Sequence, residues 1–369
     1  MGIIFLFLHH GNLNRKLHKR GCLAAPRVNF LQQRNTEELR GHRHLFAWTP
    51  EENISTMINN PLFKQYYQQL TCKIFILGHP SQGESIVFAL YGDKRIIYSC
   101  VVDSFVQNDR VVPKDLLYGL GVDKITDLFW THPHDDHSNG LVELIETFTP
   151  QSIYIPIELQ RLPENNRSLS ASVLEHINKY KGYDRRCKHQ PRVQGLAANM
   201  YLYNEYLSVG QYTVPFQLFA AAPCSGKVRK NAVDGNYSTL NDYSVVLELI
   251  VGDFSVFLTG DVQNRMVGFM SEELSMSIPT PNILKIPHHG SKDSTDIINL
   301  FSDDWLTDIA VTTAKRSSDL PRDEALQYYN SCCEKVFRVV PTATNNAIWG
   351  VEVNILNGTI TQILNENFE

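Results

Sequence analysis

Eight consecutive residues, Trp130 to His137, constrain this chain more than any other part of its sequence. They read Trp-Thr-His-Pro-His-Asp-Asp-His, so three histidines and two carboxylates fall within six positions. Residues 125–130 are largely apolar and predict a short buried strand, while residues 141–148 have the apolar spacing of a helix. The sequence therefore predicts a strand-to-helix loop on which several polar side chains converge.

The spacing within this loop suits metal binding. His132 and His134 lie two residues apart on extended backbone, so their side chains point the same way and can share one ion. Asp136 and His137 follow on the turn and can hold a second ion close by. Mixed imidazole and carboxylate ligands suit zinc, manganese and iron. The alternative is a polar surface loop, which so dense a pattern disfavours. Asp135 is not needed as a ligand, and we expect it to be solvated or to cap a helix.

This His-x-His-x-Asp-His pattern resembles the metallo-β-lactamase fold superfamily. Within it, the chain from about Cys72 to Glu369 most resembles the metallohydrolase domain of ComEC-type DNA-uptake proteins and their stand-alone relatives, without the membrane channel. The resemblance implies an α+β fold, a four-layer αββα sandwich. We therefore expect one hydrolase domain over residues 71–369, preceded by a poorly patterned N-terminal extension over residues 1–70.

Two hairpin patterns support a fold with two similar halves. Alternating strands joined by a Gly-Asp turn lead to Asp103 in residues 85–102, and to Asp261 in residues 244–258. Both patterns end in an aspartate after a buried strand. The sequence thus predicts two β-rich halves that place acidic groups at a shared rim.

The family resemblance also implies the later ligands. Asp261 is expected to bridge two ions, and His288 or His289 to complete the second site. The register between these two histidines is open, and we favour His288 because it comes first after the strand. We expect Asp103 to lie behind the His-x-His loop and to orient a ligand histidine, although a turn role at the strand end is the alternative.

One departure from the family pattern concerns the first ion. The wider superfamily supplies a third histidine from a strand before the bridging aspartate, but residues 216–224 contain none. The sequence therefore leaves open whether one or two ions bind, and whether the first site is weak, open or filled only when substrate binds. Manganese becomes an alternative to zinc.

Such a centre predicts hydrolysis. A metal ion lowers the pKa of bound water to about 7, which supplies hydroxide at neutral pH. Asp136 and Asp261 are the candidate catalytic residues, because either can hold that water and take its proton. The reaction then depends on which electrophile, a phosphorus or a carbonyl carbon, the surrounding residues accept.

Three basic clusters favour a phosphate substrate, although each alone also fits a solvated charge run. We expect binding residues at Lys227, Arg229 and Lys230, with Ser291 after the histidine pair and Asn241 near the metal-bound substrate. The other two clusters comprise Arg185, Arg186, Lys188 and Arg192, and Lys315, Arg316, Ser317 and Ser318.

The sequence accordingly predicts a metal-dependent phosphodiesterase, a nuclease acting on DNA or RNA. An ester, lactone or amide hydrolase on the same metal core is the first alternative, and a binding module with a degenerate site is the second. A net charge of -5 gives no global attraction to nucleic acid, so anion binding must be local.

Composition sets the remaining expectations. Charged residues make up 20% and hydrophobic residues 43% of the 369, as in soluble globular proteins. No apolar run approaches the roughly 20 residues that cross a bilayer, so we expect no membrane partner. The seven cysteines show no disulfide or zinc-finger spacing and fit a reducing cytoplasm. A homo-oligomer is left open.

Overall fold

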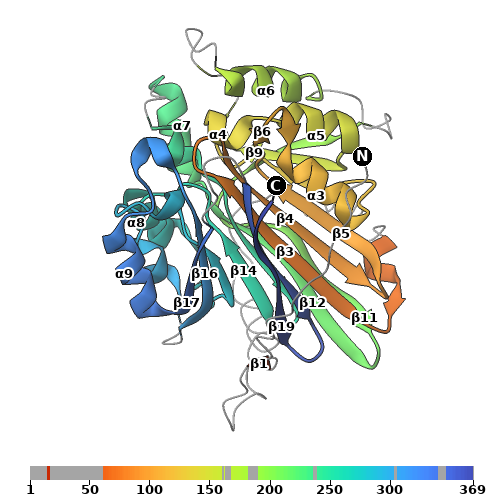
Figure 1. The fold of residues 1–369 in the computed structure, drawn as a ribbon. Helices are drawn as coiled ribbons and strands as arrows, with labels where there is room; N and C mark the ends of the chain where they lie inside the picture. The colour runs from red at the N-terminus through yellow and green to blue at the C-terminus, as the bar shows by residue number, and fades with distance from the viewer. Residues whose placement is uncertain are drawn as a thin grey trace, which may run out of the picture.

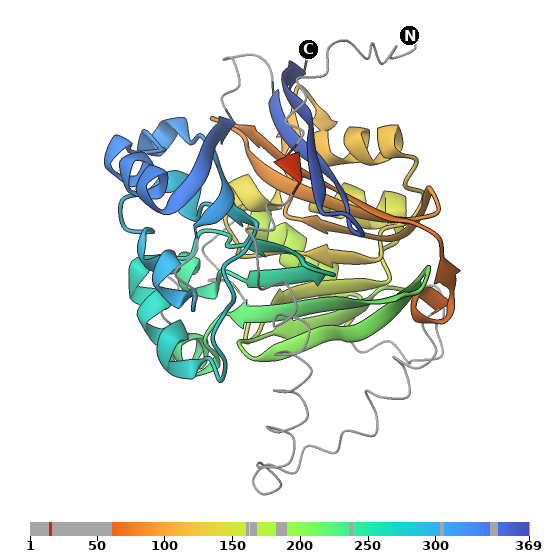
Figure 2. The same cartoon turned by 90° about the horizontal axis from the view of Figure 1, so that it is seen from below.

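Two large β-sheets lie face to face in the computed structural model, with helices on both outer faces (Figures 1 and 2). The structure describes residues 15–16, 61–159, 162, 168–181, 190–235, 239–302, 306–339 and 346–368. The expected four-layer αββα sandwich is therefore confirmed. In the described part of the chain, no helix combines the length and the apolar character that a membrane crossing requires.

The first sheet has nine strands among the described residues. Its order across the sheet is β1 (Arg15–Lys16), β19 (Thr359–Phe368), β18 (Asn346–Asn354), β3 (Leu70–His79), β4 (Gly83–Gly92), β5 (Arg95–Val102), β8 (Asp127–Phe129), β9 (Ser152–Pro156) and β10 (Arg192–Leu196).

The second sheet has eight described strands. Its order is β17 (Cys333–Val339), β16 (Thr307–Thr313), β15 (Ile283–Lys285), β14 (Phe254–Leu258), β13 (Val246–Val251), β12 (Tyr212–Ala222), β11 (Met200–Val209) and β2 (Tyr66–Tyr67). A separate small hairpin joins β6 (Val106–Gln107) and β7 (Arg110–Val111).

The helices cover the two outer faces of the sandwich (Figure 1). Over the first sheet lie α3 (Val112–Leu120), α4 (Asp135–Ser138), α5 (Leu141–Phe148) and α6 (Leu169–Asn178). Over the second lie α8 (Asn264–Glu273) and α9 (Asp323–Cys332), whereas α7 (Ser225–Val233) lies at the end of the sandwich, with Val228 in the core under the first sheet's helices. Short 3-10 turns complete the chain: η1 (Pro61–Lys64), η2 (Leu240–Tyr243), η3 (His288–Gly290), η4 (Asp296–Leu300) and η5 (Arg316–Ser318).

Side-chain alternation along the strands explains the four layers. On β14, Val256 and Leu258 enter the core between the sheets, whereas Phe257 packs under the helices of the second sheet. On β8, Phe129 enters the same central core, whereas Leu128 packs under the helices of the first sheet. Because neighbouring residues of a strand face opposite ways, strands that are apolar on both faces build three separate cores.

The two predicted hairpins are β4–β5 in the first sheet and β13–β14 in the second. One predicted hairpin therefore lies in each sheet, although the last strands of the chain, β18 and β19, return to the first sheet. The predicted strand over residues 95–102 and the predicted helix over residues 141–148 match the observed bounds of β5 and α5. The boundary expected at residue 70 stays a prediction, although η1 and β2 before it pack on β11.

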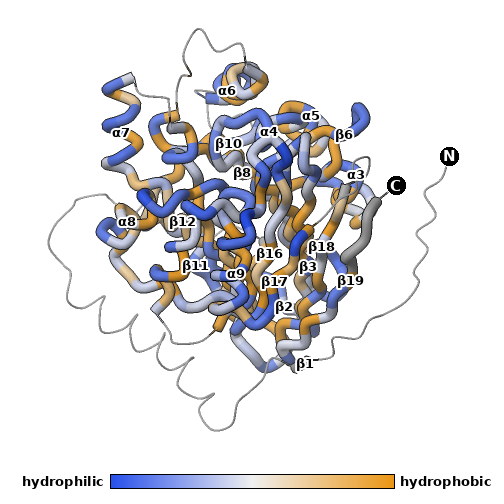
Figure 3. Tube along the Cα trace, turned by 60° about the vertical axis from the view of Figure 1, so that its left-hand side comes forward, coloured by the Kyte–Doolittle hydropathy of each residue, from blue (hydrophilic) through white to orange (hydrophobic). Residues whose placement is uncertain are grey.

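The ends of several strands meet at one end of the sandwich, where α4 lies (Figure 1). Here β4 begins and the antiparallel β5 ends, so Glu84 and Asp103 come together. In the second sheet, β14, β15 and β16 run parallel and end at the same side. Figure 3 shows α4 as hydrophilic beside the largely hydrophobic strands. This end of the fold therefore gathers polar loops from distant parts of the sequence.

Candidate metal centre

The histidine loop leaves β8 and is fixed by its own hydrogen bonds. The Trp130 indole N–H donates to Ser138 Oγ at 3.0 Å, and the Ser138 hydroxyl donates to the His134 carbonyl. Asp135 accepts hydrogen bonds from the backbone N–H and the hydroxyl of Ser170, in the first turn of α6. Asp135 thus caps a helix, one of the two roles expected for it. These contacts hold the loop in place from both ends.

Three of the expected ligands form a first ion group, which consists of His132, His134 and Asp261. His132 Nε2 lies 2.9 Å from His134 Nδ1 and 3.8 Å from Asp261 Oδ2. His132 and Asp261 are fully buried, and His134 is partly exposed. The ligand atoms therefore converge from the first and the second sheet.

Three further ligands form a second ion group, which consists of Asp136, His137 and His289. His289 Nε2 lies 3.5 Å from Asp136 Oδ2, and His137 Nε2 lies 3.9 Å from the same oxygen. Asp261 Oδ1 is 3.5 Å from His137 Nε2 and 3.8 Å from His289 Nε2. Because its other oxygen faces the first group, Asp261 lies between the two groups, and its bridging of two ions stays a prediction.

Buried ligand atoms without hydrogen bonds show that these residues fit a metal ion. Among the described residues, His137 Nε2, His289 Nε2 and both carboxylate oxygens of Asp261 find no hydrogen-bond partner. Buried polar atoms normally have one, because desolvation without a partner costs free energy. Here they face one another at 3.5–3.8 Å instead. Nitrogen and carboxylate donors in this arrangement suit a transition-metal cation.

The electrostatics of the second ion group also favour a cation. Burial alone would lower the pKa of His137, but Asp261, Asp103 and Asp136 outweigh burial and raise its pKa well above the usual value. Burial alone would raise the pKa of Asp261, but His137 and His289 hold it well below the usual value. Positive charge is thus stabilised where the His137 Nε2 atom meets two carboxylates, and a metal ion would take the same place.

The register of the histidine pair corrects the preference for His288. His289 belongs to the second ion group, whereas His288 Nε2 lies 4.0 Å from Asp261 Oδ2 and 3.5 Å from Asn241 Nδ2. Both histidines have left-handed backbone, with φ of 48° and 51°. This unusual conformation turns the chain sharply after β15, so that the second histidine, not the first, reaches the buried ligands.

Asp103 lies behind the histidine loop, as the sequence predicted. Its Oδ2 accepts hydrogen bonds from His137 Nδ1 at 2.7 Å and from the Thr131 hydroxyl at 2.6 Å. The Thr131 hydroxyl has only one proton, so its oxygen accepts from His132 Nδ1, 3.0 Å away. Asp103 and Thr131 thereby place protons on both Nδ1 atoms and leave the two Nε2 lone pairs for a metal.

Two charged residues at the centre were not among the predicted ligands. Lys315, after β16, places Nζ 2.7 Å from Asp136 Oδ2. Glu84, at the start of β4, approaches His289 Nδ1 to 3.3 Å. Lys315 stood in a basic cluster of the sequence, but nothing there distinguished it from Arg316. Glu84 follows a glycine and precedes an apolar strand. That pattern indicates a turn and gives no sign of a metal site.

The other predicted site residues lie around the centre. Asn241, on η2, places its side-chain Nδ2 3.5 Å from His288 Nε2. The Ser291 hydroxyl donates to Asp293 Oδ1, which lies 3.5 Å from His288 Nδ1. Whether Asn241 and Ser291 contact a substrate stays a prediction.

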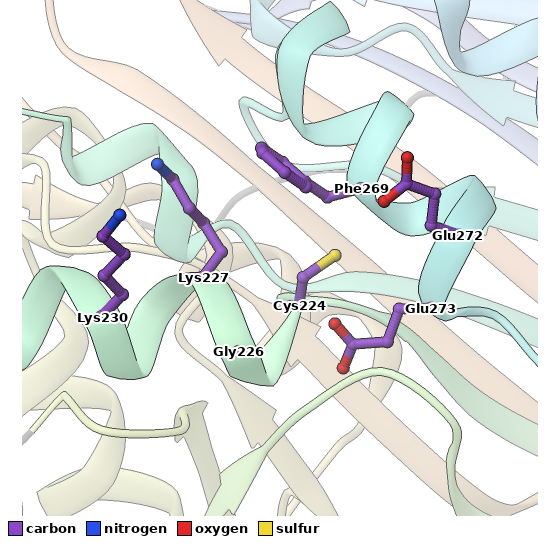
Figure 4. Close-up of a pocket in the computed structure, with 7 residues that line it drawn as sticks. All are labelled: Cys224, Gly226, Lys227, Lys230, Phe269, Glu272 and Glu273. Atoms are coloured by element: carbon purple, nitrogen blue, oxygen red, sulfur yellow. The ribbon is translucent and has the colours of Figure 1, made fainter.

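Lys227, Arg229 and Lys230 lie on helix α7, and whether they bind a substrate stays a prediction. Arg229 pairs with Glu158 at 3.4 Å, and the Lys227 ammonium lies over the Phe269 ring. Figure 4 shows Lys227 and Lys230 in a separate pocket, whose other labelled residues are Cys224, Gly226, Phe269, Glu272 and Glu273. Of the cluster at 185–192, Arg185, Arg186 and Lys188 fall outside the described residues, and Arg192 begins β10.

Comparison with known proteins agrees with this geometry. Residues 101–196, which carry the histidine loop, match the family model of the metallo-beta-lactamase superfamily. A search of curated proteins finds no match. The two stacked sheets and this match define the fold as the metallo-β-lactamase fold and support a place in that superfamily.

Solved structures give only distant likenesses. A metallo hydrolase from Ignicoccus hospitalis is 13% identical over 75% of this chain and 98% of its own, with a TM-score of 0.40. A metallo-beta-lactamase superfamily protein from Sulfolobus tokodaii is 18% identical over 51% and 62%, with a TM-score of 0.25. CmlA, a diiron β-hydroxylase from Streptomyces venezuelae, is 14% identical over 72% and 44%, with a TM-score of 0.33. These likenesses are too distant to carry an argument about activity.

Proposed function

We propose that this protein is a metal-dependent phosphodiesterase, and specifically a nuclease. The observation that carries the proposal is Lys315, whose ammonium group lies 2.7 Å from Asp136 Oδ2 at the second ion group. Its side chain is only 22% exposed. A partly buried cation beside metal ligands is suited to a substrate that brings negative charge, because a phosphate oxygen can accept a charge-assisted hydrogen bond from it.

The roles of the chain's own residues follow from their positions. The two ion groups would hold one or two zinc or manganese ions, which supply a Lewis acid that lowers the pKa of water and offsets the charge of the phosphate. Asp261 is fully buried, so its role is to bridge the two groups. The Asp136 side chain is 21% exposed and can reach a water on the open side of the centre. Asp136 is thus the candidate general base.

The substrate class rests on charge around the centre and on the ComEC-like sequence pattern. Lys315 contributes the local positive charge that the acidic chain lacks overall. Asn241 and Ser291 border His288 on the neighbouring side and would contact the same substrate. Binding of DNA or RNA through the phosphate backbone fits this arrangement, since such contacts need cations and polar groups but no base recognition.

The experiment is hydrolysis by the purified protein after chelator treatment and reloading with Mn²⁺ or Zn²⁺. The substrates are bis(p-nitrophenyl) phosphate, single-stranded DNA, RNA and p-nitrophenyl acetate. We expect metal-dependent cleavage of the phosphodiesters, which the His134→Ala variant loses. Cleavage of the acetate alone would point to an ester hydrolase, and no cleavage with bound metal would point to a binding module. Either result would overturn the proposal.

A further inference from the structure

A second buried carboxylate, besides that of Asp103, lies behind the metal centre. Glu84 is 3% exposed, and its Oε2 lies 2.9 Å from Lys285 Nζ and 3.3 Å from His289 Nδ1. The same oxygen accepts a hydrogen bond from the Thr313 hydroxyl. Glu84 belongs to the first sheet, whereas Lys285 and Thr313 belong to β15 and β16 of the second. The four residues thus join the two sheets directly behind a ligand histidine.

The direction of these hydrogen bonds determines which nitrogen of His289 carries the proton. The Thr313 hydroxyl donates its only proton to Glu84, so its oxygen can only accept from His289 Nδ1, 2.9 Å away. Nδ1 therefore carries the proton, and the lone pair lies on Nε2. That atom faces Asp136 Oδ2 at 3.5 Å and Asp261 Oδ1 at 3.8 Å. The proton position is the one that a metal-ligating histidine needs.

The same arrangement occurs on the other side of the centre. There the Thr131 hydroxyl donates to Asp103 and its oxygen accepts from His132 Nδ1. A threonine and a carboxylate thus fix a ligand histidine twice, with Thr131 following β8 of the first sheet and Thr313 ending β16 of the second. The segments that carry the two carboxylates are adjacent, because the Ser85 hydroxyl, next to Glu84, donates to the Asp103 backbone carbonyl at 2.8 Å.

Lys285 explains how a second carboxylate can remain charged in this position. Its side chain is fully buried, and its ammonium group also donates to the Ile286 carbonyl at 3.0 Å. A buried ion pair is a poor way to hold two sheets together, because apolar residues of similar size would do so without desolvating two charges. Such a pair is more readily understood if its charge serves the neighbouring histidine.

We propose that Glu84 and Thr313 are positioning residues for His289, with Lys285 as the counter-ion that keeps Glu84 ionised. This network sets the affinity of the second ion group (Asp136, His137 and His289) and leaves the first group unaffected. The inference rests on the proposed function only through its metal centre. The test of this inference measures metal binding, so an absence of phosphodiester hydrolysis would contradict the proposed function but not the inference.

The experiment titrates chelator-treated full-length protein with Co²⁺ by calorimetry and records the visible absorption of the bound ion. Outer-sphere partners of ligand histidines commonly contribute about 10–100-fold in metal affinity. We expect Glu84→Gln and Thr313→Val to lower the affinity for one of the bound ions by about that factor and to change the absorption spectrum of that ion. Lys73→Met and Glu352→Gln, which break a cross-strand ion pair between β3 and β18 away from the centre, are the matched controls.

The double variant Glu84→Gln/Lys285→Met separates positioning from folding. Removing both charges avoids an unpaired buried ion, so thermal unfolding of the metal-free double variant should resemble that of the wild type. The double variant should still show the lowered affinity for one ion and the changed absorption spectrum. Wild-type Co²⁺ affinity and spectrum in this variant would overturn the proposal, as would equal weakening of every bound ion. Thr313→Val, which leaves the ion pair intact, gives the same decision if the double variant does not fold.

Discussion

Lys315 and Asp136 form an ion pair of 2.7 Å at the edge of the second ion group, although Asp136 lies on α4 and Lys315 follows β16 of the second sheet. Burial would lower the pKa of Lys315, but Asp136 and Asp261 outweigh burial and raise it, so the ammonium stays charged at neutral pH. The pair therefore puts a permanent cation next to a metal ligand that also reaches solvent.

The first prediction concerns this cation. Lys315→Met should lower kcat/KM for bis(p-nitrophenyl) phosphate by about 10–100-fold, because a hydrogen bond to a charged group contributes about 1.5–3 kcal/mol. Metal content, measured by elemental analysis, should not fall. Arg316→Ala is the matched control, since Arg316 is the exposed neighbour on η5 and should lose little activity. Equal losses of kcat/KM in the two variants would show that Lys315 has no specific role in binding the substrate.

The second prediction concerns the tautomer of His137. In Asp103→Asn an amide group faces Nδ1 and favours the tautomer with the proton on Nε2, which opposes metal binding. Metal affinity should fall about 10–100-fold, as for other partners of ligand histidines. Calorimetric titration with Mn²⁺ measures the change, and Asp123→Asn at an exposed position is the control. Unchanged affinity in Asp103→Asn would show that Asp103 only fixes the loop.

The third prediction concerns Gly83, whose backbone packs against the histidine loop. A Cβ atom there would lie 2.0 Å from the Asp136 carbonyl oxygen, and φ is 146°. Gly83→Ala should therefore displace Asp136, weaken metal binding and lower the melting temperature. Gly268→Ala is the control, since Gly268 lies within α8 with open space at its Cβ. That substitution should stabilise the protein by about 0.5–1 kcal/mol. Wild-type metal binding by Gly83→Ala would contradict the observed packing.

The fourth prediction concerns Glu248, a carboxyl group away from the metal centre on β13. Burial raises its pKa to about 8, and no hydrogen-bond partner for Oε1 is found among the described residues. Between pH 4.5, the ordinary value, and pH 8, the folded state binds a proton that the unfolded state has released. The free energy of unfolding should therefore fall as pH rises through this window, by about 2–5 kcal/mol.

Glu248→Gln should remove this loss and be more stable than the wild type at pH 8. Urea unfolding of the metal-free protein at pH 5 and pH 8 measures it. A wild-type stability that does not decrease over this interval, or a Gln variant with the same pH dependence, would show that the buried carboxyl is already ionised.

The fold could be predicted from sequence where strands are apolar and periodic. Residues 95–102 and 141–148 are examples, and their bounds match β5 and α5. β19 was missed because its sequence, Thr-Ile-Thr-Gln-Ile-Leu-Asn-Glu-Asn-Phe, is largely polar and lacks a regular apolar alternation. It forms because β18 offers a complete edge for pairing, which no local pattern reports.

The site could be predicted where ligands stand close together, as in the loop from His132 to His137. Its remaining parts depend on backbone geometry and on the packing of two sheets. The choice of His289 over His288 follows from a left-handed turn. Glu84 and Lys315 reach the centre only because β4 begins and β16 ends at the same side of the fold. Lys285 was the one sequence signal for a buried charge near the centre, because it interrupts the apolar run Ile-Leu-Lys-Ile.

The most direct test of the whole account is the number of ions that each ligand variant binds. Calorimetric titration of chelator-treated protein with Mn²⁺ or Zn²⁺ compares the wild type with His134→Ala, His289→Ala and Asp261→Ala. Because Asp261 is shared by both groups, its removal should abolish binding, whereas each histidine variant should impair one group only. A wild type that binds no metal, or an Asp261→Ala variant that keeps the full number of ions, would contradict the account.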